Sequence, residues 1–129
     1  MIPYGKGRAL DLGCGEGFYA EYLKEKGYFT IGVDNNNEML ERASGKYDEL
    51  LNLDVQKRLP FRDNYFEFIL ALEVLEHLEN PVYTIKEINR VLKKNRRAII
   101  SVPNGLLNFE FFLQGHTHVL KKRHGKNYY

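Results

Sequence analysis

Three glycines alternate near the N-terminus, at Gly13, Gly15 and Gly17, directly after a short apolar run that ends at Leu12. Glycine removes the side chain where a backbone must turn sharply, approach a ligand closely or enter the next helix. A glycine loop between a strand and a helix is typical of sites for nucleotide-type ligands, and a simple tight turn is the alternative. The spacing therefore predicts a ligand site at the end of the first strand.

The spacing and charge of this loop disfavour a dinucleotide. Dinucleotide loops follow Gly-x-Gly-x-x-Gly, whereas this loop is Gly-x-Gly-x-Gly. A dinucleotide also places its pyrophosphate at a helix N-terminus, where Asp11 and Glu16 would repel it. A ligand that carries an ammonium and a sulfonium group would meet no such repulsion. An NAD-dependent oxidoreductase is therefore the less favoured alternative.

Two further acids follow later apolar runs. Asp34 stands 17 residues after Gly17, where a carboxylate can accept hydrogen bonds from both hydroxyls of a ribose. Its alternative role is to cap the next helix, but residues 35–37, all asparagine, already supply caps. Asp54 ends the next run and could accept a hydrogen bond from an adenine amino group, with Val55 beside the ring, or it could simply start a turn.

A third group of polar residues follows the fourth apolar run. Glu73, Glu76 and His77 stand at i, i+3 and i+4, so we expect them on one face of a helical turn. Two carboxylates and an imidazole suit Mg²⁺ or Mn²⁺, and His116 or His118 could add a ligand. We favour a site without a metal, in which Glu73 and His77 act on the substrate and His77 is a candidate general base. The alternative is that the leucines of this turn pack in the core and its polar side chains are surface groups.

Alternating strands and helices must position these residues. We expect strands over residues 8–12, 29–33, 49–53, 66–71 and 98–102, and helices over 18–26, around 39–43, over 73–78 and over 82–92. This order predicts an α/β fold with a Rossmann-like, doubly wound parallel sheet, in which ligands bind beyond the carboxyl ends of the strands. Residues 106–113 are apolar enough to pack, but their pattern does not separate helix from strand.

Composition sets the class of protein. The 129 residues, 43% hydrophobic and 28% charged, fit one soluble domain. No apolar run approaches the ~20 residues of a membrane span, and no signal-peptide pattern is present, so we expect a cytoplasmic protein with no membrane contact. The single cysteine, Cys14, excludes an internal disulfide and a multi-cysteine zinc site. We expect it to be a small loop residue and not a nucleophile.

Taken in order, these motifs resemble those of small class I S-adenosylmethionine-dependent methyltransferases. The matching stretches are residues 9–17, 31–34, 54–55, 59–67 and 71–78, and the resemblance extends from about residue 7 to Asn104. It implies transfer of a methyl group from S-adenosyl-L-methionine to an unidentified acceptor, and a strand order of 3-2-1-4-5. Residues 1–104 would form the cofactor-binding core and residues 105–129 a C-terminal extension.

The resemblance assigns roles by position. The methionine end of the cofactor would lie against Asp11, Gly13 and Gly15, the ribose against Asp34, the adenine against Asp54 and Val55, and the methyl group against Leu72 and Glu73. Asn35, directly after Asp34, would also contact the cofactor. The Glu-x-x-Glu-His pattern also resembles metal-assisted O-methyltransferases, such as those of quinone biosynthesis and of small-RNA 3′-end modification.

One departure concerns the end of the chain. The family normally adds sixth and seventh strands that form an antiparallel edge, and we expect no residues here to supply them. An open fifth strand would then pair with another chain, as in a homodimer or with a partner subunit, or with the 106–113 segment. A non-catalytic, cofactor-binding subunit completed by a partner is therefore the alternative function.

Charge is unevenly distributed along the chain. Residues 1–92 carry 11 basic and 16 acidic side chains, a net charge of −5, whereas residues 93–129 carry 8 and 1, a net charge of +7. The basic C-terminal third could attract nucleic acid or another phosphate-bearing partner, although a solvated surface is the simpler explanation.

Overall fold

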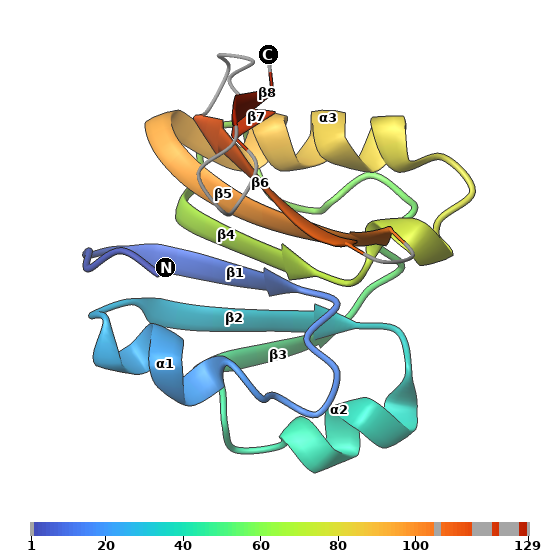
Figure 1. Cartoon of the computed structure of the whole chain (residues 1–129). Helices are drawn as coiled ribbons and strands as arrows, with labels where there is room; N and C mark the ends of the chain where they lie inside the picture. The colour runs from blue at the N-terminus through green and yellow to red at the C-terminus, as the bar shows by residue number, and fades with distance from the viewer. Residues whose placement is uncertain (1, 105–106, 115–119, 122–126, 129) are drawn as a thin grey trace.

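A six-stranded sheet lies at the centre of the molecule, in the order β3-β2-β1-β4-β5-β6 (Figure 1). The computed structural model describes residues 2–104, 107–114, 120–121 and 127–128. The strands are β1 (Arg8–Leu12), β2 (Phe29–Asp34), β3 (Glu49–Asn52), β4 (Phe66–Leu72), β5 (Leu92–Asn104) and β6 (Leu107–Gln114). The first five are parallel, which confirms the predicted order 3-2-1-4-5.

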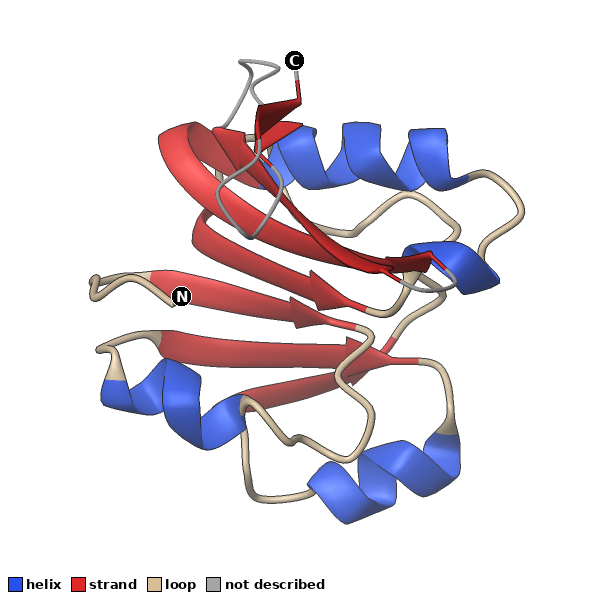
Figure 2. Ribbon diagram, viewed as in Figure 1, coloured by secondary structure: helices blue, strands red, loops and turns tan. Residues whose placement is uncertain are grey.

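Helices cover both faces of this sheet, as Figure 2 shows. They are α1 (Ala20–Glu25), α2 (Asn37–Ala43), the 3₁₀ turn η1 (Leu75–His77) and α3 (Pro81–Val91). Leu10 and Leu12 pack in one buried cluster with Ile88 of α3, whereas Ala9 packs on the opposite face with Leu23 of α1. Because alternate residues of a strand point to opposite faces, the apolar strands are buried on both sides, and the doubly wound architecture is confirmed. Among the described residues, no helix is both long and apolar enough to span a bilayer.

The edge beyond β5 differs from the expectation. β6 runs antiparallel beside β5, with register pairs from Arg97↔Gln114 to Asn104↔Leu107. The expectation that no residues supply an antiparallel edge strand is thus corrected, and of the alternatives left open, pairing with the 106–113 segment is the one in the structure. A second, two-stranded sheet pairs β7 (Leu120–Lys121) with β8 (Asn127–Tyr128).

β5 also begins earlier than predicted, at Leu92, directly after α3. Its register with β4 shifts between the pairs Phe66↔Leu92 and Phe68↔Arg97, so residues 93–96 form an irregular stretch. Asn95 has a φ of 60° in this stretch, a left-handed conformation that asparagine tolerates better than most residues. The charged residues 93–97 therefore enter the sheet through a bulge.

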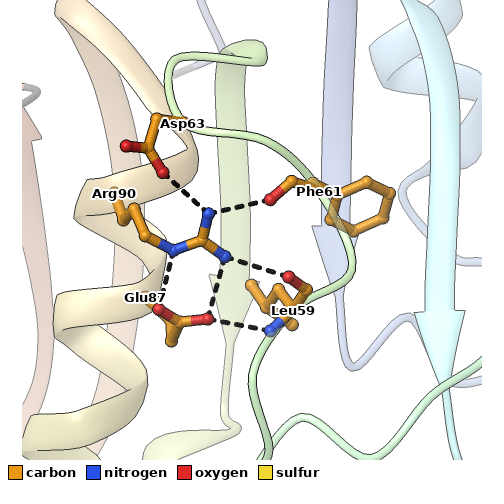
Figure 3. A network of polar contacts seen from close by, with 5 residues as sticks. All are labelled: Leu59, Phe61, Asp63, Glu87 and Arg90. Carbon is orange, nitrogen blue, oxygen red and sulfur yellow. Dashed lines mark hydrogen bonds and ion pairs between the residues drawn. The ribbon is translucent and has the colours of Figure 1, made fainter.

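Arg90 of α3 fastens the connection between β3 and β4 to the helix (Figure 3). Its guanidinium donates to the Glu87 carboxylate at 2.8 and 3.0 Å, to the carbonyl oxygens of Leu59 (2.9 Å) and Phe61 (2.8 Å), and to Asp63 Oδ1 (2.9 Å). The buried Glu87 also accepts a hydrogen bond from the Leu59 N–H at 2.8 Å. The hydrogen bonds from Arg90 hold the pKa of Glu87 below its usual value, so both partners are charged.

We expect Arg90→Met to destabilise the fold by about 3–5 kcal/mol, because it leaves the Glu87 charge buried without its partner. The measurement is the free energy of unfolding in urea. Arg42→Met is the matched control, since Arg42 makes only exposed ion pairs with Glu16 and Glu38 and should cost no more than ~1 kcal/mol. Equal losses in the two variants would contradict this role for Arg90.

Candidate functional site

The glycine loop is anchored to the end of β2. The N–H groups of Gly13 and Cys14 both donate to the carbonyl oxygen of Val33, at 2.8 and 2.9 Å. Gly13, Gly15 and Gly17 have φ values of 72°, 55° and 89°, a region that favours glycine. At Gly13 space matters as well, because a Cβ there would lie 2.5 Å from Cγ2 of Val74. The loop therefore needs glycine for its conformation and, at Gly13, for close packing.

The Asp34 carboxylate joins this loop to the start of α2. Its Oδ2 accepts from the N–H of Gly15 at 2.9 Å, and its Oδ1 accepts from the N–H of Asn36 at 3.0 Å. Asn36, and not Asp34, caps the helix, by accepting from the N–H groups of Glu38 and Met39. Because each carboxylate oxygen can accept two hydrogen bonds, Asp34 has acceptor capacity left for a ligand.

A cavity of about 250 Å³ opens at the carboxyl edge of the sheet. It is lined by Gly13, Asp34, Asn35, Asp54, Val55, Gln56, Glu73, Val74, His77 and Leu78. The structure thus brings together most of the residues that the sequence indicated, from the ends of three parallel strands and from the turn after β4. Gln56, Val74 and Leu78 were not anticipated, and only Leu78, which ends the expected helical turn, carried a signal in the sequence.

The segment after β3 forms one wall of this cavity. Asp54 Oδ1 accepts from the N–H of Gln56 at 2.9 Å, so Asp54 shapes a turn, the alternative role, while it also lines the cavity. The Gln56 side chain in turn accepts from the N–H of Glu79 at 3.2 Å, and the Thr84 hydroxyl donates to the carbonyl oxygen of Val55 at 3.4 Å. These contacts hold the wall against the start of α3.

The turn after β4 differs from the expected helix. Glu73 has a φ of 55°, and its N–H donates to the carbonyl oxygen of Ser101 at 3.2 Å. It therefore precedes the 3₁₀ turn, and the prediction that Glu73, Glu76 and His77 share one helical face is wrong. A non-glycine residue in this conformation is uncommon and often marks a functional site. His77 Nε2 lies 3.4 Å from Glu76 Oε1, and its side chain is 78% exposed.

Glu73, Glu76 and His77, the possible metal ligands among the described residues, do not converge. Among the residues that the structure describes, no group of three His, Cys, Asp or Glu side chains is placed to hold a metal ion. Glu73 and His77 line the cavity, while Glu76 contacts His77. His116 and His118 lie outside the described residues.

Asp11 lies beneath the glycine loop and does not line the cavity. Its side chain is 3% exposed and accepts a hydrogen bond from the Tyr47 hydroxyl at 2.5 Å. The pKa of Asp11 is raised to about 6. Burial is the main cause, the hydrogen bond from Tyr47 acts against it, and the charge of Asp34 adds to it. Burial, followed by the charges of Asp11 and Asp34, likewise raises the pKa of the Cys14 thiol to about 12. Cys14 therefore stays protonated near neutral pH, as expected of a loop residue that is no nucleophile.

Three other residues differ from their expected places. Leu72 packs against the buried cluster on the α1 face and does not line the cavity. Gly15 contacts Asp34 through its N–H but does not line the cavity either. Glu16 pairs with Arg42 of α2 at 3.6 Å, so its charge is directed toward α2, and the expected repulsion of a pyrophosphate by Glu16 is not supported.

The charges of the cavity suit a cationic ligand. Three of its lining residues, Asp34, Asp54 and Glu73, are acids, and none of the described lining residues is Lys or Arg. Fixed carboxylates in a partly enclosed cavity produce a negative potential, which attracts an ammonium or sulfonium group. The acidic lining of the cavity therefore fits the positively charged S-adenosylmethionine better than a pyrophosphate.

Comparison with known proteins agrees with this chemistry. Residues 10–100 match a family described as "Methyltransferase domain". A ubiquinone biosynthesis O-methyltransferase of Pelagibacter ubique is 31% identical over 120 residues, which cover 88% of this chain and 50% of that protein. The chain spans about half the length of the curated relatives it matches.

Two solved structures of methyltransferases are also similar to this chain. A SAM-dependent methyltransferase from Archaeoglobus fulgidus has a TM-score of 0.72 and 30% identity, over 79% of this chain and 47% of that chain. A putative methyltransferase of Haloferax volcanii, in complex with the Trm112 methyltransferase activator, has a TM-score of 0.70 and 27% identity, over 79% and 47% of the two chains.

We expect Gly13→Ala to destabilise the protein by about 2–4 kcal/mol, since it combines left-handed backbone strain with overpacking against Val74. Gly15→Ala is the control, because Gly15 shares the positive φ but a Cβ there meets nothing within 4 Å, so only the strain of about 1–2 kcal/mol applies. Urea unfolding measures both. The contact with Val74 is unimportant if the two variants are equally stable.

Proposed function

The chain belongs to the class I S-adenosylmethionine-dependent methyltransferase family, and from this premise we propose that it transfers the methyl group of this cofactor to an acceptor bound beside Glu73 and His77. The observation that carries the proposal is the acid-lined cavity at the carboxyl edge of the sheet, where Gly13, Asp34 and Glu73 meet. The comparisons give no support for the NAD-dependent oxidoreductase that the glycine loop left open.

We propose that the cofactor lies along the carboxyl ends of β1, β2 and β3. Asp34 would accept from the ribose hydroxyls with its remaining lone pairs, and Asn35 lies beside it in the cavity wall. Asp54 and Val55 would flank the adenine. The bare Cα atoms of Gly13 and Gly15 would leave room for the methionine end close to the backbone. This arrangement extends past the cavity into the loop, as the small cavity volume requires.

In the proposed reaction, the main task of the protein is to position the acceptor and the methyl group. S-adenosylmethionine supplies a methyl group on an already activated sulfonium leaving group. The side chains must then hold the acceptor in line with that methyl group. Glu73, fixed by its N–H bond to Ser101, would orient the acceptor. His77, which lines the same cavity, would take the proton from an oxygen or nitrogen nucleophile as a general base.

A second candidate is a cofactor-binding subunit that acts only with a partner protein. The Haloferax volcanii neighbour, which was solved with a methyltransferase activator, favours this candidate. Methyl transfer that appears only when a second protein is added would support the subunit over the complete enzyme.

Calorimetry with S-adenosylmethionine, S-adenosylhomocysteine and NAD tests the binding half of the proposal. We expect the first two to bind and NAD not to bind. Asp34→Ala should weaken S-adenosylmethionine binding by about 10- to 100-fold, because hydrogen bonds to a charged acceptor contribute about 1.5–3 kcal/mol. Asp48→Ala is the control, because the Asp48 carboxylate accepts hydrogen bonds from Thr30 at the opposite end of β2. This variant should leave the affinity unchanged. An unchanged affinity in Asp34→Ala would rule out the ribose assignment.

Transfer of radiolabel from S-adenosylmethionine into small-molecule, protein and RNA fractions of a cell extract tests the chemical half. We expect labelling of one fraction, reduced about 100-fold or more in His77→Asn if this residue is the general base, with cofactor affinity retained. Glu79→Gln, an exposed acid that does not line the cavity, is the control. Loss of labelling on addition of EDTA would instead indicate a metal-dependent step and contradict the metal-free role of His77.

A further inference from the structure

Tyr47, which lies between α2 and β3, reaches the buried carboxylate beneath the glycine loop. Its hydroxyl donates to Asp11 Oδ2 at 2.5 Å, and the two side chains are 7% and 3% exposed. The two residues are 36 positions apart in the sequence, and neither lines the cavity. This contact is therefore a buried link between the first strand and the connection from α2 to β3.

Two glycines make room for the Tyr47 ring. A Cβ on Gly32 would lie 2.9 Å from Cδ2 and Cε2 of the ring, and a Cβ on Gly17 would lie 3.2 Å from Cε2. Gly32 is the register partner of Asp11 on the neighbouring strand, and its φ is not positive. Glycine is thus needed at position 32 for space. The ring crosses β2 at Gly32 and places its hydroxyl on Asp11.

Burial and the neighbouring charges determine which side chain of this contact holds the proton. Burial and the charge of Asp11 raise the pKa of Tyr47 above its usual value, so the tyrosine keeps its proton and acts as the donor. The pKa of Asp11 is raised to about 6, mainly by burial and further by the charge of Asp34, while the hydrogen bond from Tyr47 lowers it. The Cys14 thiol, which also faces this group, is neutral. Tyr47 therefore favours the ionised form of Asp11, against burial and the neighbouring acid.

We propose that Tyr47 is a positioning residue for cofactor binding, whose hydroxyl holds the Asp11 carboxylate beneath the glycine loop so that its negative charge attracts the cationic methionine end of S-adenosylmethionine. This inference rests on the proposed placement of that end against Gly13 and Gly15. A cation held there favours ionised Asp11 further, so binding below about pH 6 must release a proton. Affinity should accordingly fall as the pH falls through this range.

Calorimetry with S-adenosylmethionine between pH 5 and 8.5 tests the proposal in the full chain. We expect the wild-type affinity to decline below about pH 6. Tyr47→Phe keeps the ring against Gly32 but removes the donor, so the pH midpoint should rise by about one to two units. Its affinity should be about two- to tenfold lower at pH 7 and approach that of the wild type at pH 8.5. A purely structural role for the hydroxyl would lower affinity equally at every pH.

Three controls make the outcome decisive. Tyr28→Phe also removes a buried tyrosine hydroxyl, which donates to the carbonyl oxygen of Pro3 at 2.8 Å, and it should leave the midpoint unmoved. Asp11→Asn should remove the Asp11-dependent change, and adding Tyr47→Phe to it should then have no further effect on the midpoint. The inference fails if the wild type binds but Tyr47→Phe keeps the wild-type midpoint. Absence of binding by the wild type at every pH would instead overturn the proposed function itself.

Discussion

The site depends on one carboxylate that accepts two backbone hydrogen bonds. Asp34 takes one from Gly15 and one from Asn36, and so fixes the glycine loop relative to the start of α2. These are charge-assisted bonds, which are stronger than neutral ones. The N–H groups of Gly13 and Cys14, which both donate to the carbonyl oxygen of Val33, add a second link between the glycine loop and β2. The side chain proposed to hold the ribose is thus the same one that shapes the loop for the rest of the cofactor.

The sequence predicts this edge well because its signals are local. Gly13, Asp34 and Asp54 each follow an apolar strand, and parallel strands bring their carboxyl ends to one edge. Glu73 was placed in the right cavity but in the wrong conformation, since its left-handed φ ends the strand before the 3₁₀ turn begins. Helical spacing at i, i+3 and i+4 carries no information about such a break.

Other features depend on contacts that no local pattern encodes. β6 was ambiguous because an apolar run of eight residues fits either a helix or a strand, and only pairing with β5 decides. The contact of Tyr47 with Asp11 joins a loop residue to a residue of β1. The one sequence feature that indicates it is Gly32, a glycine within a β-strand. Such a glycine often marks a close approach of another group. In this chain that group is an aromatic ring from another segment.

Asp11 and Asp34 lie on adjacent strands. Asp34 stabilises the glycine loop, whereas the buried Asp11 opposes folding near neutral pH, which points to a role in ligand binding. The raised pKa of Asp11 means that the folded protein binds a proton more tightly than the unfolded chain between about pH 4 and 6, so the fold loses stability as the pH rises through this window. The ionised form is nevertheless the one that a cationic ligand favours. A buried carboxylate that opposes folding near neutral pH is hard to explain by packing alone, since an apolar residue would fill the same space without this cost. The cost has a physical reason if the charge beneath the glycine loop is there for the ligand, with Tyr47 reducing the penalty and the cofactor's own charge offsetting more of it.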